Sequence, residues 1–359
     1  MKVITLLGTR PDIIKLAEIS KCLDKHTDHI IVHTGQNYSE ELNAVFYKGL
    51  GLRQPDYYLD CATERLGQTL GNIFDRFESV LIKEKPDAVL FLGDTNSALG
   101  AIVAKRHKIP LFHLEAGNRC FDDNTPEEVN RRLLDHISDI NMVYSEEAWQ
   151  NLLEEGVPLD RTFLVGSPMR EVIEKNLPEP PISSRDVIIA SIHREENLEP
   201  GRLDGIIEAL ATVSHTIGVK VELYAHPRLH KALSSGAIPI NNNLIKLKTA
   251  VGWKKYINLQ RSARCVISDS GTLAEESSIL YLPAVSLRTT TERQEAVARG
   301  NLIISGLKPD DIVNAVQLAT TLPVSCMPEE YSRSDVSAIV TRLIVSYTPY
   351  VRRYVYGLR

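Results

Sequence analysis

The pattern of apolar and polar positions repeats along the whole chain. Short apolar runs, rich in β-branched residues, alternate with amphipathic segments that have helical spacing. In the first half the expected strands are VITLL, HIIVHTG, DAVLFLG, IPLFHL, INMVYS and TFLVG. In the second half they are VIIASI, KVELYAH, RCVISDSG, PAVSL and NLIIS. Alternation of this kind predicts an α/β fold with parallel sheets covered by helices on both faces.

One segment interrupts this alternation. The run KNLPEPPISSRD contains three prolines and two serines and is the best candidate for a linker. We therefore expect two doubly wound, Rossmann-like domains, residues 1–174 and 186–340. A C-terminal helix at 341–359 is expected to pack back toward the first domain. Because ligands of open α/β sheets bind at the carboxyl ends of the strands, we expect the active site in a cleft between the domains.

Composition narrows the class of protein. A length of 359 residues allows two domains with separate cores, and a net charge of −5 favours neither nucleic acid nor an anionic membrane as a partner. The five cysteines are scattered without a CxxC pair, which argues against a disulfide framework or a metal site and suits a reducing cytoplasm. No stretch approaches the roughly 20 apolar residues of a membrane helix. A cytoplasmic protein without a bound metal is expected.

Polar residues follow the expected strands of the first half. GTRPDIIK comes after the first strand, where Gly8 suits a tight turn and Arg10 and Lys15 suit a phosphate near a helix N-terminus. A helix start with incidental basic residues is the alternative, and the absence of GxGxxG weakens a dinucleotide interpretation. Asp94 is the second residue of GDTNSALG, which follows another strand. It could cap the next helix, but the three polar residues after it can also do so.

The stretch HLEAGNRCFDDNTPEEVNRRLLDH is dense in charge. Thr125 and Glu128 fit the N-cap and N3 positions of a capping box, with Pro126 at the first helical position. A helical wheel predicts a buried apolar stripe and a solvated ion-pair face. The stripe comprises Val129, Leu133, Ile137 and Ile140, and the solvated face comprises Glu128, Arg132 and Asp135. The candidates left for chemistry are Asp94, Glu115 and Glu127, with Asn130 and Arg131 in support.

The second half repeats the arrangement. His193-Arg194 and His226-Arg228 follow consecutive strands, and although a single histidine there is more often structural, two such pairs favour anion binding. In DSGTLAEESS, the turn Ser270-Gly271-Thr272 leads into a helix and offers free backbone N–H groups to a phosphate. Acidic and basic side chains suited to a ribose and a diphosphate follow this turn: Glu275, Glu276, Glu292 and Arg293.

Taken together, these motifs resemble the non-hydrolysing UDP-N-acetylglucosamine 2-epimerase family over essentially the whole chain. The motifs that carry the resemblance are GTRP…K, GDTNS, HLEAGNR, PEEVNRR, HREEN, HPR, DSGTLAEES and TTERQEA. Each alone is weak, but all eight occur in the family's order and spacing. The resemblance implies two Rossmann-like domains of the glycosyltransferase-B type, a homodimer, UDP bound in the cleft, and neither a cofactor nor a metal.

The resemblance also implies roles for single residues. Asp94, Glu115 and Glu127 match the family's catalytic acids, and His193, counted with them, would bind the diphosphate. Tyr256 would lie against uracil, and Glu276 would hold the ribose. The remaining residues implied in binding of UDP or the sugar are Arg10, Lys15, Asn130, Arg131, His226, Ser270, Gly271, Thr272 and Arg293.

The sequence departs from the commonest family members at several places. TGQNYSEEL stands where allosterically regulated enzymes carry a glutamine–histidine–arginine run, so activation by bound UDP-N-acetylglucosamine is not expected. TGQNY, EAGNRCFD, GSPM and YTPYVRR resemble the subgroup that makes UDP-N-acetyl-L-fucosamine from a 6-deoxy talo sugar for capsule or O-antigen. UDP-N-acetylglucosamine is the other expected substrate. A hydrolysing epimerase and a retaining UDP-sugar glycosyltransferase are the alternative functions.

Overall fold

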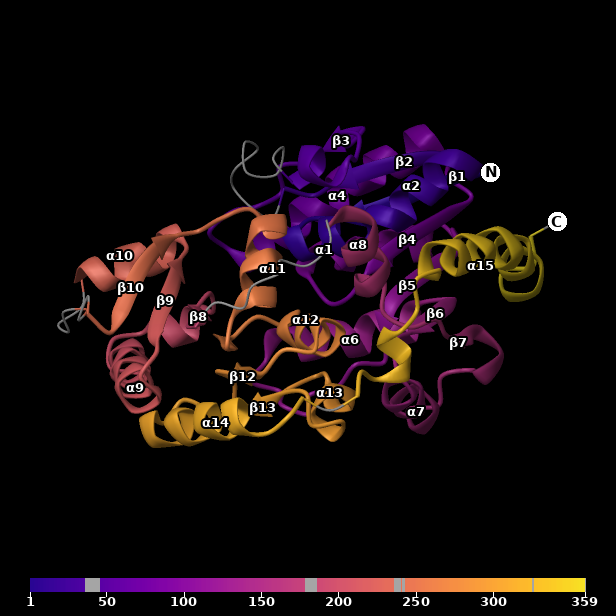
Figure 1. Ribbon diagram of the computed structural model, residues 1–359. Coiled ribbons are helices and arrows are strands. Elements are labelled where there is room, and N and C mark those ends of the chain that lie inside the picture. Colours follow the sequence, from indigo (N-terminus) through magenta and orange to yellow (C-terminus); the bar gives the residue numbers. More distant parts are fainter. Residues whose placement is uncertain (36–45, 178–185, 236–239, 241–242, 325, 359) are drawn as a thin grey trace. The chain divides into compact units, whose positions relative to one another are not determined.

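The computed structural model describes residues 1–35, 46–177, 186–235, 240, 243–324 and 326–358 (Figure 1). The chain divides into two compact units. The first contains Met1–Asn176 and Glu330–Arg359, and the second contains Leu177–Glu329. None of the described helices is long and apolar enough to cross a membrane.

The described part of the first unit contains a seven-stranded parallel sheet with the order β3-β2-β1-β4-β5-β6-β7. Its strands are β1 (Lys2–Leu7), β2 (Asp28–His33), β3 (Tyr57–Tyr58), β4 (Ala88–Leu92), β5 (Leu111–Ala116), β6 (Ile140–Val143) and β7 (Thr162–Leu164). All but β3 match an expected strand; β3 has only two residues, too few to show a pattern. The strand order reverses between β1 and β4, and such a switch point leaves a crevice at the carboxyl ends.

Helices cover this sheet because each has one apolar stripe to bury. They are α1 (Arg10–Lys15), α2 (Ala17–His26), α4 (Leu66–Glu84), α5 (Ala101–Arg106), α6 (Pro126–Ile137), α7 (Glu146–Glu154) and α8 (Met169–Asn176). Short 3₁₀ turns lie at Asn96–Gly100 and Leu159–Arg161. Ile73 and Phe77 of α4 pack with Leu6 of β1 and Phe91 of β4 in one buried cluster.

The C-terminal segment belongs to the first unit from Glu330 onward, earlier than the expected position 341. The carbonyl of Glu330 accepts from the backbone N–H of Ser167 at 3.0 Å. Farther on, the carboxylate of Glu171 in α8 accepts from the backbone N–H and the hydroxyl of Ser337, at 2.8 and 2.5 Å. These bonds fix the start of α15 (Val336–Tyr350), which packs on α2 and continues into a π-helical turn at Val351–Val355.

The described part of the second unit contains a six-stranded parallel sheet with the order β10-β9-β8-β11-β12-β13. Its strands are β8 (Val187–Ser191), β9 (Lys220–Ala225), β10 (Ile245–Thr249), β11 (Cys265–Ser268), β12 (Ala284–Ser286) and β13 (Ile303–Ile304). Sequence patterning missed β10, in which lysines alternate with apolar residues. The order reverses between β8 and β11, so the two units share one design.

Helices of the second unit enclose a separate core around β8, β9 and β11. They are α9 (Arg202–Ile217), α10 (Pro227–Ser235), α11 (Trp253–Ser262), α12 (Leu273–Leu280), α13 (Gln294–Ala298) and α14 (Pro309–Thr321), with a 3₁₀ turn at Glu195–Leu198. A further 3₁₀ turn, Glu329–Tyr331, lies where the chain returns to the first unit. Each unit thus has its own sheet and core, which is the two-domain α/β fold that the sequence predicts.

Candidate functional site

The turn after β1 is built by close packing. A Cβ atom on Gly8 would lie 1.9 Å from the hydroxyl oxygen of Ser97, so only glycine fits, although its φ is not in the left-handed region. Asp12 accepts from the backbone N–H groups of Gly8 and Thr9, at 3.0 and 2.9 Å. Burial raises the pKa of Asp12 to about 6, against the lowering effect of these two bonds. The turn presents α1 at the edge of the sheet.

The two basic residues of this turn differ in their surroundings. The Arg10 guanidinium lies over the ring of Phe46, 5.6 Å from its centroid, and burial lowers its pKa. The ammonium of Lys15 is buried and lies 2.7 Å from Oε2 of Glu115. Lys15 also lies 5.6 Å from the ring centroid of Tyr144. Lys15 therefore contacts a predicted catalytic acid, which the sequence did not anticipate.

Glu115 has an unusual backbone. Its φ is +72°, in the region that favours glycine, and the pairing of β5 with β6 shifts register between Leu114 and Ala116. Residues held in this conformation are uncommon and cluster at functional sites, and bulges re-aim side chains next to active sites. A Cβ on Gly93, after β4, would lie 3.9 Å from the Glu115 carboxyl. The bulge thus places this carboxyl beside the end of the neighbouring strand.

Asp94 follows β4 directly and is bound by α6. Its Oδ2 lies 2.7 Å from Nε of Arg131. The side-chain amide of Asn130 donates to the backbone carbonyl of Asp94 at 2.8 Å and to Oδ1 of Asn96 at 3.2 Å. The structure thus brings two of the three predicted acids, Asp94 and Glu115, to adjacent strand ends, each beside a cation.

The predicted capping box in α6 is wrong. Thr125 is at the N-cap, but its side chain makes no capping hydrogen bond. Glu128 points inward and accepts from the backbone N–H groups of Cys120 and Phe121, at 3.1 and 3.2 Å, and from Arg131 at 2.8 Å. Burial opposes ionisation of Glu128, but these bonds hold its pKa below the usual range. Glu128 therefore fixes both the preceding loop and Arg131.

The predicted burial of α6 is wrong for most of the residues named, although Ile137 packs against the core and Ile140 is buried, in β6. Val129 and Leu133, assigned to a buried stripe, are 52% and 47% exposed, whereas Asp135 is 1% exposed. Asp135 can be buried because Arg119 donates to it at 2.7 Å and the backbone N–H of Gly117 donates at 3.2 Å. Of the predicted solvated face, only Arg132 is exposed. The half-buried Glu127 lies beside Glu128 in the first turn.

In the second unit, Asp269 organises the turn after β8. It accepts from the backbone N–H groups of His193 and Arg194, at 2.9 and 3.0 Å, and from the amide of Asn197 at 2.9 Å. Burial opposes ionisation of Asp269, but the His193 contact and these bonds hold its pKa below the usual value. The His193 ring stays exposed at the carboxyl edge, with Nδ1 3.4 Å from Asp269.

The turn before α12 is tied to α11. Thr272 donates to one carboxylate oxygen of Glu276 at 3.0 Å, and Gln260 donates to the other at 2.9 Å. The hydroxyls of Ser270 and Thr272 lie 3.1 Å apart. A Cβ on Gly271 would lie 3.2 Å from Oε1 of Glu292. The structure therefore joins the predicted phosphate turn to the predicted ribose acid.

The other predicted residues of this unit are Tyr256 in α11, His226 after β9 and Arg293 at the N-cap of α13. The Tyr256 hydroxyl lies 2.8 Å from Oγ of Ser191, and burial raises the pKa of Tyr256. His226 directly follows β9. Arg293 is 2% exposed, and its guanidinium lies 3.5 Å from Oε2 of Glu275. How these residues meet a ligand stays a prediction.

Sequence reasoning missed several buried polar residues at the strand ends. Arg288, two residues after β12, pairs with Glu292 at 2.8 Å. His113 lies inside β5, and Asp12 and Asp269 hold the turns described above. The sequence held a signal for two of them. His113 lies inside the apolar strand IPLFHL, and Arg288 directly follows the apolar strand PAVSL. The segment TGQNYSEEL, used to predict the absence of allosteric activation, lies largely outside the described residues.

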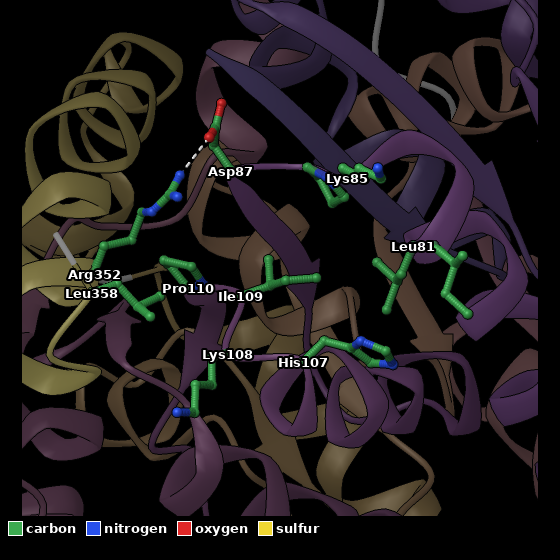
Figure 2. A pocket seen from close by; sticks show the side chains of 11 residues that line it. Leu81, Lys85, Asp87, His107, Lys108, Ile109, Pro110, Arg352 and Leu358 are labelled. Atoms are coloured by element: carbon green, nitrogen blue, oxygen red, sulfur yellow. Dashed lines mark hydrogen bonds and ion pairs between the residues drawn. The ribbon is translucent and has the colours of Figure 1, made fainter.

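A separate pocket lies at the opposite edge of the first sheet (Figure 2). Its volume is about 440 Å³, and its lining residues Lys85, Asp87, Lys108 and Pro110 precede β4 and β5. In Figure 2 the side chains of Lys85 and Lys108 lie on different sides and do not converge, and Asp87 is paired with Arg352 at 2.7 Å. The candidate site is therefore at the carboxyl edge. Within the described residues, no group of His, Cys, Asp and Glu side chains could hold a metal ion.

Comparison with known proteins places the chain in a family. The family model described as UDP-N-acetylglucosamine 2-epimerase matches residues 21–344. The chain belongs to this family. Its members are isomerases, so this 2-epimerase family member is an enzyme of that class.

Relatives match nearly the full length. A solved UDP-N-acetylglucosamine 2-epimerase from Rickettsia bellii is 39% identical, with a TM-score of 0.91 and 99% of each chain covered. The Methanocaldococcus jannaschii UDP-GlcNAc 2-epimerase, solved in complex with UDP-GlcNAc and UDP, is 34% identical, with a TM-score of 0.88, and the match covers 96% of this chain and 99% of that one. A UDP-2,3-diacetamido-2,3-dideoxy-D-glucuronate 2-epimerase from Pseudomonas aeruginosa is 34% identical over 328 residues, which cover 88% of this chain and 92% of the relative.

Proposed function

We propose that this chain is a non-hydrolysing UDP-N-acetylhexosamine 2-epimerase that inverts C2 through elimination and re-addition of UDP. The observation that carries the proposal is the pair of ion pairs at adjacent strand ends, Asp94 with Arg131 and Glu115 with Lys15. These carboxyl groups lie at the carboxyl ends of β4 and β5, next to the switch point between β1 and β4. Carboxyl groups in such a place are suited to proton transfer to and from a bound sugar.

The chemistry explains why several acids are needed. The C2 proton of an N-acetylhexosamine is not next to a carbonyl, so no enolate stabilises its removal. In the proposed reaction a carboxylate takes the C2 proton while the bond from C1 to the UDP oxygen breaks with its electron pair, leaving a 2-acetamidoglycal and UDP. UDP then adds back at C1, and an acid delivers a proton to the other face of C2. Asp94, Glu115 and Glu127 are the proposed bases and acids.

The second unit is proposed to bind UDP. Leaving-group departure requires stabilisation of a diphosphate, for which preorganised N–H groups and cations serve best. His193, Arg293 and the turn at Ser270–Thr272 are the proposed diphosphate groups, together with Arg10 and Lys15 of the first unit. Glu276 is proposed to hold the ribose, and Tyr256 to contact uracil. His226, Asn130 and Arg131 complete the proposed binding set.

For the sugar, we propose a 6-deoxy UDP-N-acetyl-L-hexosamine converted from talo to fuco, with UDP-N-acetylglucosamine as the second candidate. A relative named for a diacetamido-glucuronate, at 34% identity, supports a range of sugars within the family. The complex of the M. jannaschii enzyme supports a UDP-sugar. In this chain Cys120, part of the subgroup motif EAGNRCFD, lies 3.2 Å from Glu128 and 3.5 Å from Arg131, which pairs with the proposed acid Asp94.

We further propose a cytoplasmic homodimer that supplies sugars for a cell-surface polysaccharide. The assembly is tested by sedimentation equilibrium of the purified chain. A mass of one chain across a range of concentrations would contradict the dimer. The remaining proposals concern chemistry and are tested by the fate of the C2 hydrogen.

The decisive experiment is incubation with UDP-N-acetylhexosamines in D₂O without an acceptor. The sugars are D and L forms, with and without a 6-hydroxyl, and NMR follows C2. We expect deuterium at C2 and a mixture of C2 epimers that both retain UDP. Release of free sugar and UDP would indicate a hydrolysing epimerase, and lack of deuterium with every sugar would leave a retaining glycosyltransferase as the better assignment.

A further inference from the structure

His113 occupies a buried position between the elements that carry the proposed acids. It lies in β5, two residues before Glu115, and is 1% exposed. Its Nε2 lies 2.9 Å from the backbone carbonyl oxygen of Gly93, the residue before Asp94. Its Nδ1 lies 2.9 Å from Oδ1 of Asp135. One imidazole thus touches the turn after β4 and the helix α6.

The partners of the ring lie on both of its sides. A carbonyl oxygen only accepts, so Nε2 must carry a proton to bond to Gly93. Oδ1 and Oδ2 of Asp135 receive the N–H of Gly117, and Oδ2 also receives the guanidinium of Arg119 at 2.7 Å. Burial works against ionisation of Asp135, but His113 and Arg119 hold its pKa below the usual value. Asp135 is therefore held from several sides, with Nδ1 of His113 beside its Oδ1.

The surroundings hold this ring in one orientation. It stacks on the buried ring of Phe91, with centroids 4.7 Å apart and planes at 19°. Arg119, which shares Asp135, is held in turn by Glu155 at 2.8 and 2.6 Å. The groups facing the imidazole are therefore Phe91 from β4, Gly93 from the turn after it and Asp135 from α6, with Arg119 behind the carboxylate.

We propose that His113 is a positioning residue that sets the Gly93–Asp94 turn against Glu115 and α6. The inference rests on the proposed epimerase function. Gly93 has a φ of +64° and lies against the Glu115 carboxyl. The bond from His113 to the carbonyl of Gly93 holds the turn in this place. A displacement of about 1 Å in a catalytic group can lower turnover about 100-fold. His113 itself acts through these groups, not on the substrate.

Two variants separate the contacts of the ring. In His113→Gln the amide nitrogen can reach the place of Nε2 and donate to Gly93, whereas in His113→Asn it takes the place of Nδ1 and faces Asp135. We expect kcat to fall about 100-fold in His113→Asn and about 10-fold or less in His113→Gln, with KM and the Kd for UDP within about threefold of wild type in both. The matched control is His107→Asn, a change at an exposed histidine of the pocket in Figure 2. This variant should keep wild-type kcat.

A spectroscopic measurement tests the contact with Gly93 without reference to turnover. In ¹⁵N-histidine NMR, His113 is expected to carry a proton on Nε2, the nitrogen that faces the Gly93 carbonyl, assigned by the signal lost in His113→Gln. A ring without that proton would overturn the proposal, as would equal kcat losses in the two variants or kcat near wild type in both. If wild-type enzyme fails to exchange C2 with D₂O, the proposed function is wrong, whereas an active wild type with unaffected variants contradicts the role of His113 alone.

Discussion

The ammonium of Lys15 lies 2.7 Å from the carboxylate of Glu115, and both side chains are nearly buried. The pair joins the helix after β1 to the bulge at the end of β5, where Glu115 has a left-handed φ of +72°. Lys15→Met removes the cation but leaves the buried carboxylate. We expect a loss of about 3–5 kcal/mol in the free energy of unfolding, as found when one partner of a buried pair is removed. Urea unfolding measures it.

The double variant Lys15→Met/Glu115→Leu is the control for this prediction. With both charges gone, no carboxylate is left beside an apolar side chain, so much of the lost stability should return. The double variant should show no turnover, because the proposed acid Glu115 is gone. Equal stability of Lys15→Met and wild type would mean that the pair is dispensable for the fold.

The neighbouring acids Glu127 and Glu128 are expected to respond differently to loss of charge. Glu127→Gln should lower kcat by about 10²–10⁴-fold, the range for loss of a general acid or base, while UDP affinity stays within a few-fold. Its stability should be that of wild type, because Glu127 is only half-buried. Near-normal turnover would contradict a catalytic role.

Glu128→Gln should instead lower stability. The buried carboxylate pairs with Arg131 at 2.8 Å and accepts from two backbone N–H groups, so the neutral amide leaves Arg131 with one anionic partner fewer. We expect a lower thermal midpoint than in Glu127→Gln, measured by differential scanning calorimetry. Matching midpoints in the two variants would contradict the structural role of Glu128.

Asp12 is expected to make stability depend on pH. Burial raises its pKa from the ordinary 3.8 to about 6, so the folded state binds the proton more tightly than the unfolded chain. Its contribution therefore favours the fold below pH 4 and is lost as the pH rises through about 6. Relative to Asp12→Asn, which is neutral throughout, wild type should lose about 2 kcal/mol between pH 4 and pH 7. A pH-independent difference between the two unfolding curves would contradict this prediction.

Asp269 is expected to show the opposite dependence. The pKa of its carboxyl lies below the usual 3.8, so its stabilising effect is present above that pH and is lost as the pH falls below it. Asp269→Asn should lower both the thermal midpoint at neutral pH and the affinity for UDP, since the carboxylate holds the backbone at His193 and Arg194. His193→Asn should weaken UDP binding alone, because its ring is exposed. Calorimetric titration with UDP measures affinity, and a normal midpoint for Asp269→Asn would count against its role.

Strand positions could be predicted because buried parallel strands are continuous apolar runs. Residues that directly follow such runs must lie at the carboxyl edge of the sheet, and this alone selected Asp94, Glu115, His193 and the turn at Ser270. Among the described residues, strand prediction failed where a strand is very short, as in β3, or carries alternating charge, as in β10. These features depend on local pattern and on the topology that local pattern imposes.

The burial of α6 could not be predicted in the same way. A helical wheel ranks faces by side-chain polarity, and it assigned Asp135 to solvent and Val129 to the core. In the structure Asp135 is buried, because His113, Arg119 and the backbone of Gly117 converge on it from another part of the chain. A charge can be buried when partners from elsewhere satisfy it, and those partners are absent from any local pattern.

The sequence by itself determined the two α/β units, the strand ends and the residue types that reach them, since periodicity and turn chemistry act over a few neighbouring residues. Only the tertiary structure decided which of those side chains pair. Lys15 meets Glu115, Arg131 meets Asp94, and His113 links Gly93 to Asp135, each across many residues of chain. The physical reason is that ion pairs and buried hydrogen bonds depend on distances of about 3 Å, which are set only when separate strands and helices pack together.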